Sequence, residues 1–416
     1  MSDFWHRFKK HLLIFLAVAG PGLITAVADN DASGVATYTV AASLYGMSSQ
    51  YLVVLTTLLL GVTQEIGARM AIVTGKGLGD LIREHYGVRV SVFIFLIYFL
   101  ANQAVILQDV SGLKSSIQLF NLPWQLMLVV VCTLLILLVV WLDFKRLQRI
   151  FLFAILFYAT YIFSAVLANP NWGQSLKESL ILPQRAFIYN SGYWLALIAV
   201  LGTTVTAWGQ FFINSFMADK GLRPHELKAA RWEVYLGAFL TNFLSWMMAI
   251  AVTYTLFKHG IRVTDGYTAA LAIKPLAGAL SGTLFAVGLL AASFLGLTII
   301  PLATTYVFTE LFGYERTLNA SFTKGRVFYL FFILQIILGL LISLFPNINL
   351  FNITLWANYL NGAILPVIFY FVIKFSEDSA IMGEYISRGF SKWYLRGASA
   401  LILVATLATL YGNFIH

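Results

Sequence analysis

Apolar runs long enough to cross a lipid bilayer follow one another along this chain and leave few folds open to it. A helix needs about 20 mostly apolar residues to span the hydrocarbon core. Eleven runs approach or exceed this length: 12–45, 47–66, 90–113, 124–142, 148–168, 192–217, 235–257, 275–309, 327–345, 350–373 and 395–412. A membrane β-barrel would instead show alternating segments of about ten residues. The chain is therefore predicted to be an all-α polytopic membrane protein.

The composition excludes most soluble functions. Hydrophobic residues make up 60% and charged residues 11% of the 416 residues, against roughly 45–50% and about 25% in soluble globular proteins. A soluble enzyme or a nucleic-acid-binding protein is not expected, despite the net charge of +9. The single cysteine, Cys132, excludes a disulfide framework and a thiolate metal cluster.

The basic residues predict the orientation of the chain. If the N-terminus is cytoplasmic, 21 of the 27 Lys and Arg residues fall in cytoplasmic segments. Basic residues concentrate in cytoplasmic loops of membrane proteins. We therefore expect a multi-pass protein of the plasma (inner) membrane, with its N-terminus in the cytoplasm and its C-terminus outside.

Two of the runs are interrupted by polar residues and glycine. The first carries two carboxylates, Asp29 and Asp31, next to Asn30, Ser33 and Gly34. The sixth, 192–217, is interrupted over 202–215, which reads Gly-Thr-Thr-Val-Thr-Ala-Trp-Gly-Gln-Phe-Phe-Ile-Asn-Ser. Carboxylates at membrane depth are costly unless they meet water, a partner or a cation. A shallow loop between two short helices is the alternative interpretation of the first interruption.

Runs one and six are corresponding members of two halves of five helices. Interruptions at corresponding positions of two halves are typical of transporters whose site lies at an inverted-repeat interface. We predict one transmembrane domain, 1–416, with repeat one at about 12–168, repeat two at about 192–373 and an extra helix at about 395–412.

Other buried polar residues have less specific interpretations. Glu65 is expected to pair with Arg69, four residues later on the same helix. Asp109, Asn358 and Asn361 are slightly more typical of structural roles than of ligands. No nucleotide-binding loop or zinc-type histidine pair occurs, so we do not expect an enzyme.

Two motifs resemble one family. Residues 20–22 read Gly-Pro-Gly and 31–37 read Asp-Ala-Ser-Gly-Val-Ala-Thr, while 69–78 read Arg-Met-Ala-Ile-Val-Thr-Gly-Lys-Gly-Leu. They resemble the Gly-Pro-Gly, Asp-Pro-Gly-Asn and Arg-x-x-x-Val-Thr-Gly-Lys-x-Leu motifs of the natural resistance-associated macrophage protein (Nramp) divalent-metal transporters. The resemblance covers essentially all eleven runs. It implies a LeuT-like fold of the amino-acid/polyamine/organocation superfamily, with a 5+5 inverted repeat and broken helices 1 and 6.

The departures from the family pattern concern the metal and the proton. Residues 207–210 read Ala-Trp-Gly-Gln where the family has Met-Pro-His-Asn, and Gly34 replaces the Asn of the first motif. Ile106 replaces an acid of span three, and Gly209 and Asn214 stand where the family has histidines linked to proton coupling. This pattern is similar to that of the Nramp-related magnesium transporters, in which uptake is not thought to be proton-coupled.

Donor chemistry favours the same cargo. Thioether and imidazole suit transition metals, whereas carboxylate, carbonyl and water suit Mg²⁺, which usually keeps several waters. Loss of Met and Asn is expected to leave a roomier, oxygen-only site for Mg²⁺, and for Mn²⁺ beside it. The expected metal-site residues, with Asp31 as principal ligand, are Asp31, the Ala28 and Ala207 carbonyls, Gln210, Gly34, Asp29 and Asn358.

Two other transporters remain as alternatives. A proton-coupled Mn²⁺/Fe²⁺ symporter would use Asp29, Glu65 or Asp109 as its acids. An amino-acid carrier is disfavoured, because two Asp residues would repel the substrate carboxylate. We expect the metal ion only as cargo, with no cofactor, and the bilayer as surroundings. Neither a nucleic-acid partner nor an obligate protein partner is expected.

Overall fold

The computed structural model describes residues 20–181, 183, 185–263, 279–315, 318, 322–344 and 354–414, and these form helices and their connections. Ten helices in the described ranges are long and apolar enough to cross a membrane. The first predicted run adds two shorter helices, α2 (Pro21–Ala28) and α3 (Ala32–Tyr45). The prediction of an all-α membrane protein is confirmed, although residues 12–19, 275–278, 345 and 350–353 of the predicted runs lie outside the described part.

The remaining predicted runs each correspond to one helix or to a broken pair. They are α4 (Val53–Thr74), α5 (Leu78–Leu119), α6 (Trp124–Trp141), α7 and α8 (Phe144–Ile155 and Ala159–Leu167), α11 and α12 (Ser191–Thr204 and Ala207–Lys220), α13 (Leu227–Thr255), α15 (Ala279–Phe312), α16 (Arg326–Ser343), α17 (Thr354–Ser376) and α19 (Gly389–Phe414). Short helices α9 (Trp172–Leu180), α10 (Arg185–Ile188) and α18 (Ser379–Met382) lie in the connections.

The third span is longer than its apolar run. The sequence predicts 90–113, whereas α5 begins at Leu78 and is kinked at Gly87, whose φ of 74° lies in the left-handed region. The first turns of α5 carry charged residues, so hydropathy alone does not include them. The kink uses a residue without a Cβ, for which a positive φ is inexpensive.

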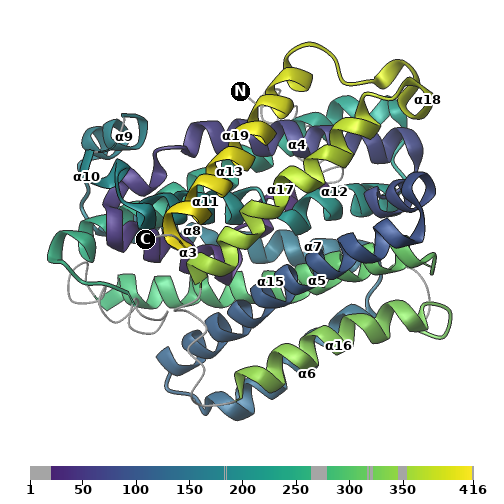
Figure 1. Ribbon diagram of the computed structural model, residues 1–416. Coiled ribbons are helices and arrows are strands. Elements are labelled where there is room, and N and C mark those ends of the chain that lie inside the picture. The colour runs from purple at the N-terminus through teal and green to yellow at the C-terminus, as the bar shows by residue number, and fades with distance from the viewer. Residues whose placement is uncertain are drawn as a thin grey trace, which may run out of the picture.

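The centre of the bundle is formed by helix pairs that pack closely along their length. Helix α5 packs on α15, and α11 packs on α17. A Cβ atom at Gly202 of α11 would overlap the Asn358 carbonyl and the Gly362 backbone of α17, so these two backbones touch. By contrast, α6 and α16 lie along one edge of the bundle, and α19 crosses its front (Figure 1). Most of α6 and α19 is unburied, as expected for helices that face lipid.

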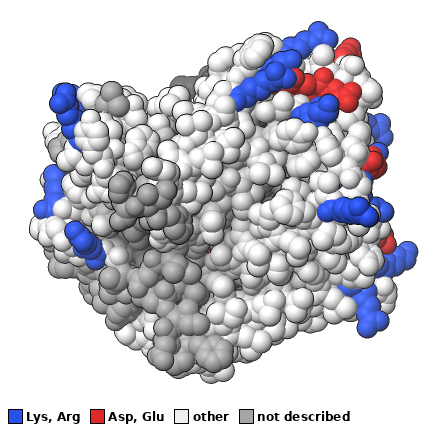
Figure 2. All heavy atoms as spheres, viewed as in Figure 1, with Lys and Arg blue, Asp and Glu red and all other residues white. Residues whose placement is uncertain are grey.

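The charged side chains mark the two ends of the bundle. Helices α9 and α10 lie at one end and α18 at the opposite end (Figure 1). Figure 2 shows Lys and Arg side chains at both ends of this face and a broad uncharged band between them. The band is the surface that a bilayer would cover. Which end faces the cytoplasm stays a prediction from the basic residues.

Candidate metal site

The first broken span leaves three residues between its two helices. Helix α2 ends at Ala28 and α3 begins at Ala32, with Asp29, Asn30 and Asp31 buried between them. Asp31 caps α3, because its Oδ1 accepts a 2.6 Å hydrogen bond from the Gly34 amide. The Ala28 carbonyl accepts from the Asp31 amide at 3.0 Å. One lone pair of that carbonyl is therefore already used within the break.

The second broken span meets the first one. Helix α11 ends before Val205, whose φ of −116° and ψ of 76° are not helical. Thr206 caps α12 by accepting a 3.0 Å hydrogen bond from the Gly209 amide. The same hydroxyl donates to Asp29 Oδ1 at 2.7 Å. The two interruptions that the sequence predicts thus form one buried polar centre.

The middle residue of the first break is fixed from three sides. The Asn30 carbonyl accepts from the Tyr158 hydroxyl at 2.8 Å. The Asn30 side chain donates from Nδ2 to the Thr241 hydroxyl at 2.8 Å, and its Oδ1 accepts from the Ser245 hydroxyl at 2.9 Å. Buried polar groups that are satisfied in this way hold a single conformation. Asp29 and Asp31 consequently project from a fixed segment.

Helices α5 and α17 approach the first turn of α3 with further polar groups. Asp109 Oδ1 accepts from the Ser33 amide at 3.2 Å, and the Ser33 hydroxyl donates to Gln108 Oε1. Asn358 of α17 donates to the hydroxyls of Ser33 and Thr37, each at 2.8 Å. In this arrangement Asn358 uses its amide nitrogen to hold α3, and its oxygen is the group left for a cation or water.

Several buried polar atoms around this centre have no hydrogen-bond partner in the described part of the chain. They include Asp29 Oδ2, Asp109 Oδ2, Gln108 Nε2, Gln210 Nε2 and both terminal atoms of Gln64. More than nine in ten buried polar groups in proteins are hydrogen-bonded. Carboxylate oxygens of this kind can be satisfied by a cation or by the waters of its hydration shell.

Gly34 does not provide the extra space expected from the sequence. A Cβ atom at this position would lie 2.6 Å from the Asp29 carbonyl oxygen and 3.2 Å from the Thr203 hydroxyl. The space that a side chain at position 34 would need is occupied by the backbone of the break and by the end of α11. Glycine at this position allows a close approach of backbone segments rather than an enlarged cavity.

The predicted site residues lie at the first break and in the first turns of α3 and α12, and one lies in the second turn of α17. Ala28, Asp29 and Asp31 lie at the first break, and Gly34 lies in the first turn of α3. Ala207 and Gln210 lie in the first turn of α12. Asn358 contacts α3 from α17. Their roles as ligands stay predictions.

Two further residues contribute polar groups close to the predicted site residues. The carboxylate of Asp109, for which a structural role is slightly favoured from the sequence, accepts from the Ser33 amide in the first turn of α3, next to the break. A buried carboxylate in the middle of a span is a signal that the sequence already carries. Thr206 belongs to the predicted interruption 202–215, but the sequence does not distinguish it from the other polar residues there. In the described ranges, no group of three or more His, Cys, Asp and Glu side chains is placed to hold a metal ion. A bound cation would therefore also use carbonyls, amide oxygens or water.

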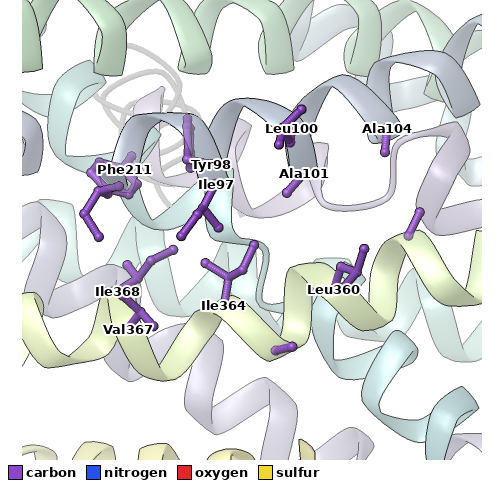
Figure 3. A pocket seen from close by; sticks show the side chains of 13 residues that line it. Ile97, Tyr98, Leu100, Ala101, Ala104, Phe211, Leu360, Ile364, Val367 and Ile368 are labelled. Carbon is purple, nitrogen blue, oxygen red and sulfur yellow. The ribbon is translucent and has the colours of Figure 1, made fainter. Parts of the chain in front are cut away.

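A cavity of 370 Å³ between α5 and α17 is chemically unsuited to a cation. In Figure 3 the side chains of Ile97, Ile364 and Ile368 face the gap between these helices, with Tyr98 and Phe211 at one end. An apolar lining cannot replace the hydration shell of an ion. The polar centre between the breaks is thus the better candidate.

Comparison with known families agrees with this geometry. Residues 22–412 match the family model described as natural resistance-associated macrophage protein-like. The chain belongs to the Nramp family. The match includes both breaks and every described spanning helix except the first residue of α2 and the end of α19.

Relatives and structurally similar proteins cover nearly the whole of this Nramp protein. The divalent metal cation transporter MntH of Latilactobacillus sakei subsp. sakei is 23% identical over 97% of this chain and 90% of its own length. A variant of the manganese transporter of Eremococcus coleocola has a TM-score of 0.74 at 20% identity, covering 96% of this chain and 88% of that one. The structure of MhsT in complex with L-phenylalanine has a TM-score of 0.63 at 14% identity, covering 94% and 98%. The predicted LeuT-like fold is confirmed.

Proposed function

We propose that this protein carries Mg²⁺, and Mn²⁺ beside it, into the cytoplasm by alternating access and without proton coupling. A divalent cation as cargo is supported by the relatives, which are named as divalent metal and manganese transporters. The proposal concerns the choice of metal and the driving force, and both depend on the groups at the two breaks.

The observation that carries the magnesium proposal is the donor chemistry at the breaks. Asp29, Asp31 and Asp109 supply carboxylates, and Thr206 and Gln210 supply a hydroxyl and an amide. Ala207 stands where a thioether would favour a transition metal. Carboxylates, neutral oxygens and retained waters are the surroundings in which proteins hold Mg²⁺.

The proposal of uptake without protons follows from the same positions. Gly209 and Asn214 have no titratable group, and Ile106 on α5 is apolar. An inside-negative membrane potential favours entry of a divalent cation by about 4.6 kcal/mol per 100 mV, which is twice the value for a unit charge. In this proposal the membrane potential and the metal gradient drive uptake, and no proton gradient is required.

A proton-coupled Mn²⁺ symporter is the second candidate. It is favoured by the manganese transporter among the similar structures and by Asp109, a buried carboxylate that reaches the first turn of α3. Such a carboxylate could exchange a proton during transport. The two candidates differ in whether Mg²⁺ competes with Mn²⁺ for transport and in whether protons move with the metal.

A single flux assay separates the candidates. The purified protein is placed in liposomes with a pH-reporting dye, and Mn²⁺ entry is measured with increasing external Mg²⁺. We expect millimolar Mg²⁺ to compete with Mn²⁺ and the internal pH to stay constant. If Mg²⁺ fails to compete, the magnesium proposal is wrong and the symporter replaces it.

A further inference from the structure

A basic cavity lies at the end of the bundle that carries α18, away from the two breaks. Its volume is 490 Å³, and it is bounded by α4, the start of α13 and the segment that leads into α19. Eight residues line it: Glu65, Arg69, Arg231, Tyr235, Ile386, Arg388, Phe390 and Ser391. Three guanidinium groups therefore share this space with one carboxylate.

The carboxylate is already used by two of the arginines. Glu65 Oε1 accepts from Arg69 Nε at 3.1 Å, which confirms the predicted pair, and from Arg231 Nε at 2.7 Å. Arg69 also donates to the Tyr385 carbonyl and, at 3.1 Å, to the Ser387 hydroxyl. Arg388 forms no ion pair with any described residue, and its side chain is exposed. The cavity keeps an excess of two positive charges.

Exposed apolar side chains lie on α13 and α19, the two helices whose first turns help to bound the cavity. Phe390 and Trp393 on α19 are 65% and 67% exposed. On α13, Trp232, Leu236 and Phe239 are exposed at positions next to Arg231 and Tyr235, and they continue down the helix as a stripe. Tryptophan and tyrosine are enriched where a membrane protein meets the headgroup layer. The charged cavity thus lies close to exposed apolar side chains of α13 that are suited to contact acyl chains.

We propose that this cavity binds the phosphate of an anionic phospholipid headgroup, with the acyl chains on the α13 stripe. Arginine matches phosphate because its planar guanidinium donates two parallel hydrogen bonds. Basic cavities between membrane helices are known recognition sites for such headgroups. A lipid is favoured over a soluble phosphate because the exposed apolar side chains lie on the same helix as Arg231 and Tyr235, which line the cavity. The proposal does not depend on which ion is transported.

Binding of a fluorescent phosphatidylglycerol to the detergent-solubilised protein tests the proposal. Arg388→Gln removes a positive charge that has no described ion-pair partner, and Arg231→Gln removes one that is paired with Glu65. Both side chains are exposed. A basic side chain near an anionic lipid surface contributes about 1 kcal/mol, which corresponds to about a fivefold change in affinity. We expect each variant to weaken phosphatidylglycerol binding about fivefold, and the affinity for phosphatidylcholine to stay low in all proteins.

The control is Lys228→Gln, a change of equal charge on an exposed residue of the same helix that does not line the cavity. It should leave binding nearly unchanged. An equal loss in this control would mean general surface attraction and would overturn the proposal. Displacement of the lipid by glycerol 3-phosphate would identify a soluble-anion site instead. Equal affinity of the wild type for phosphatidylglycerol and phosphatidylcholine would overturn the proposal and would mean that the arginines serve only the internal ion pairs with Glu65.

Discussion

The Thr206 hydroxyl donates a 2.7 Å hydrogen bond to Asp29 Oδ1 and so joins the breaks of two spans that are 177 residues apart in the sequence. The same oxygen caps α12 through the Gly209 amide. One hydroxyl therefore fixes both the start of a helix and the orientation of a buried carboxylate. A change in either break is transmitted to the other through this contact.

Two substitutions of Thr206 distinguish the effect of its hydroxyl from the effect of its side-chain volume. Thr206→Val removes the cap and leaves the Asp29 carboxylate without this donor, so we expect a loss of about 1–2 kcal/mol in stability and clearly slower metal uptake. Thr206→Ser keeps the hydroxyl and should retain most of both. Thermal unfolding and liposome flux measure the two effects. Wild-type uptake by a folded Thr206→Val protein would contradict a role for the contact.

Asp31→Asn is the sharpest test of the principal ligand. The Asn side chain can still accept from the Gly34 amide, so the cap of α3 is kept while the negative charge is lost. We expect metal flux to be abolished with little change in the melting temperature. Asp31→Ala should lose flux and about 1 kcal/mol of stability as well. Near-normal uptake by Asp31→Asn would show that another group binds the cargo.

Uptake should depend little on pH if no proton is transported. His is the side chain that ordinarily titrates between pH 5 and 8, and Gly209 and Asn214 occupy two of the relevant positions. We expect initial Mg²⁺ uptake to change little between about pH 5.5 and 7.5. Metal-dependent acidification of the vesicle lumen that saturates with metal would refute this expectation. Asp109→Asn would then identify the carboxylate involved.

The paired change Ala207→Met with Gly34→Asn tests metal selectivity. It introduces a thioether and an amide, and it should lower Mg²⁺ transport more than Mn²⁺ transport. Because a Cβ at position 34 meets the Asp29 carbonyl, the single Gly34→Asn variant is the necessary control. Competition of Mg²⁺ against Mn²⁺ flux is compared in all three proteins. Unchanged competition in the pair would show that these positions do not select the metal.

Two ion pairs at the same carboxylate should differ strongly in their effect on stability. Arg69 is almost fully buried, so Glu65→Gln, which breaks both pairs, leaves a buried guanidinium without its anion and should cost about 3 kcal/mol. The Arg231 side chain is 53% exposed, and Arg231→Gln should cost less than about 1 kcal/mol. Unfolding in detergent compares them. Equal losses would mean that Arg231 is held more tightly than its exposure suggests.

The sequence was sufficient for the fold because hydropathy depends on local composition. Each apolar run became a helix or a broken pair, and the breaks fall where Asp29, Asp31 and Thr206 interrupt the pattern. The helix ends were less predictable. Helix α5 begins at Leu78, twelve residues before the apolar run 90–113. Charged residues can continue a helix beyond the bilayer, but they are not part of an apolar run.

The details of the site depend on contacts between distant residues, which no local pattern records. Asp109 reaches Ser33 across 76 residues, and Asn358 reaches Ser33 across 325. Gly34 indicated open space in the sequence, but the space is filled by the carbonyl of Asp29. Such packing is decided by how whole helices dock, so residue types alone could suggest the donor set but not its geometry.

The backbone contact between Gly202 of α11 and the turn of α17 from Asn358 to Gly362 has a mechanical consequence. Helices whose main chains touch can slide or separate only by breaking their closest packing. We therefore expect α11 and α17 to travel together as one rigid unit. Opening and closing of the polar centre must then take place across other surfaces, where bulkier side chains allow the helices to slip past one another.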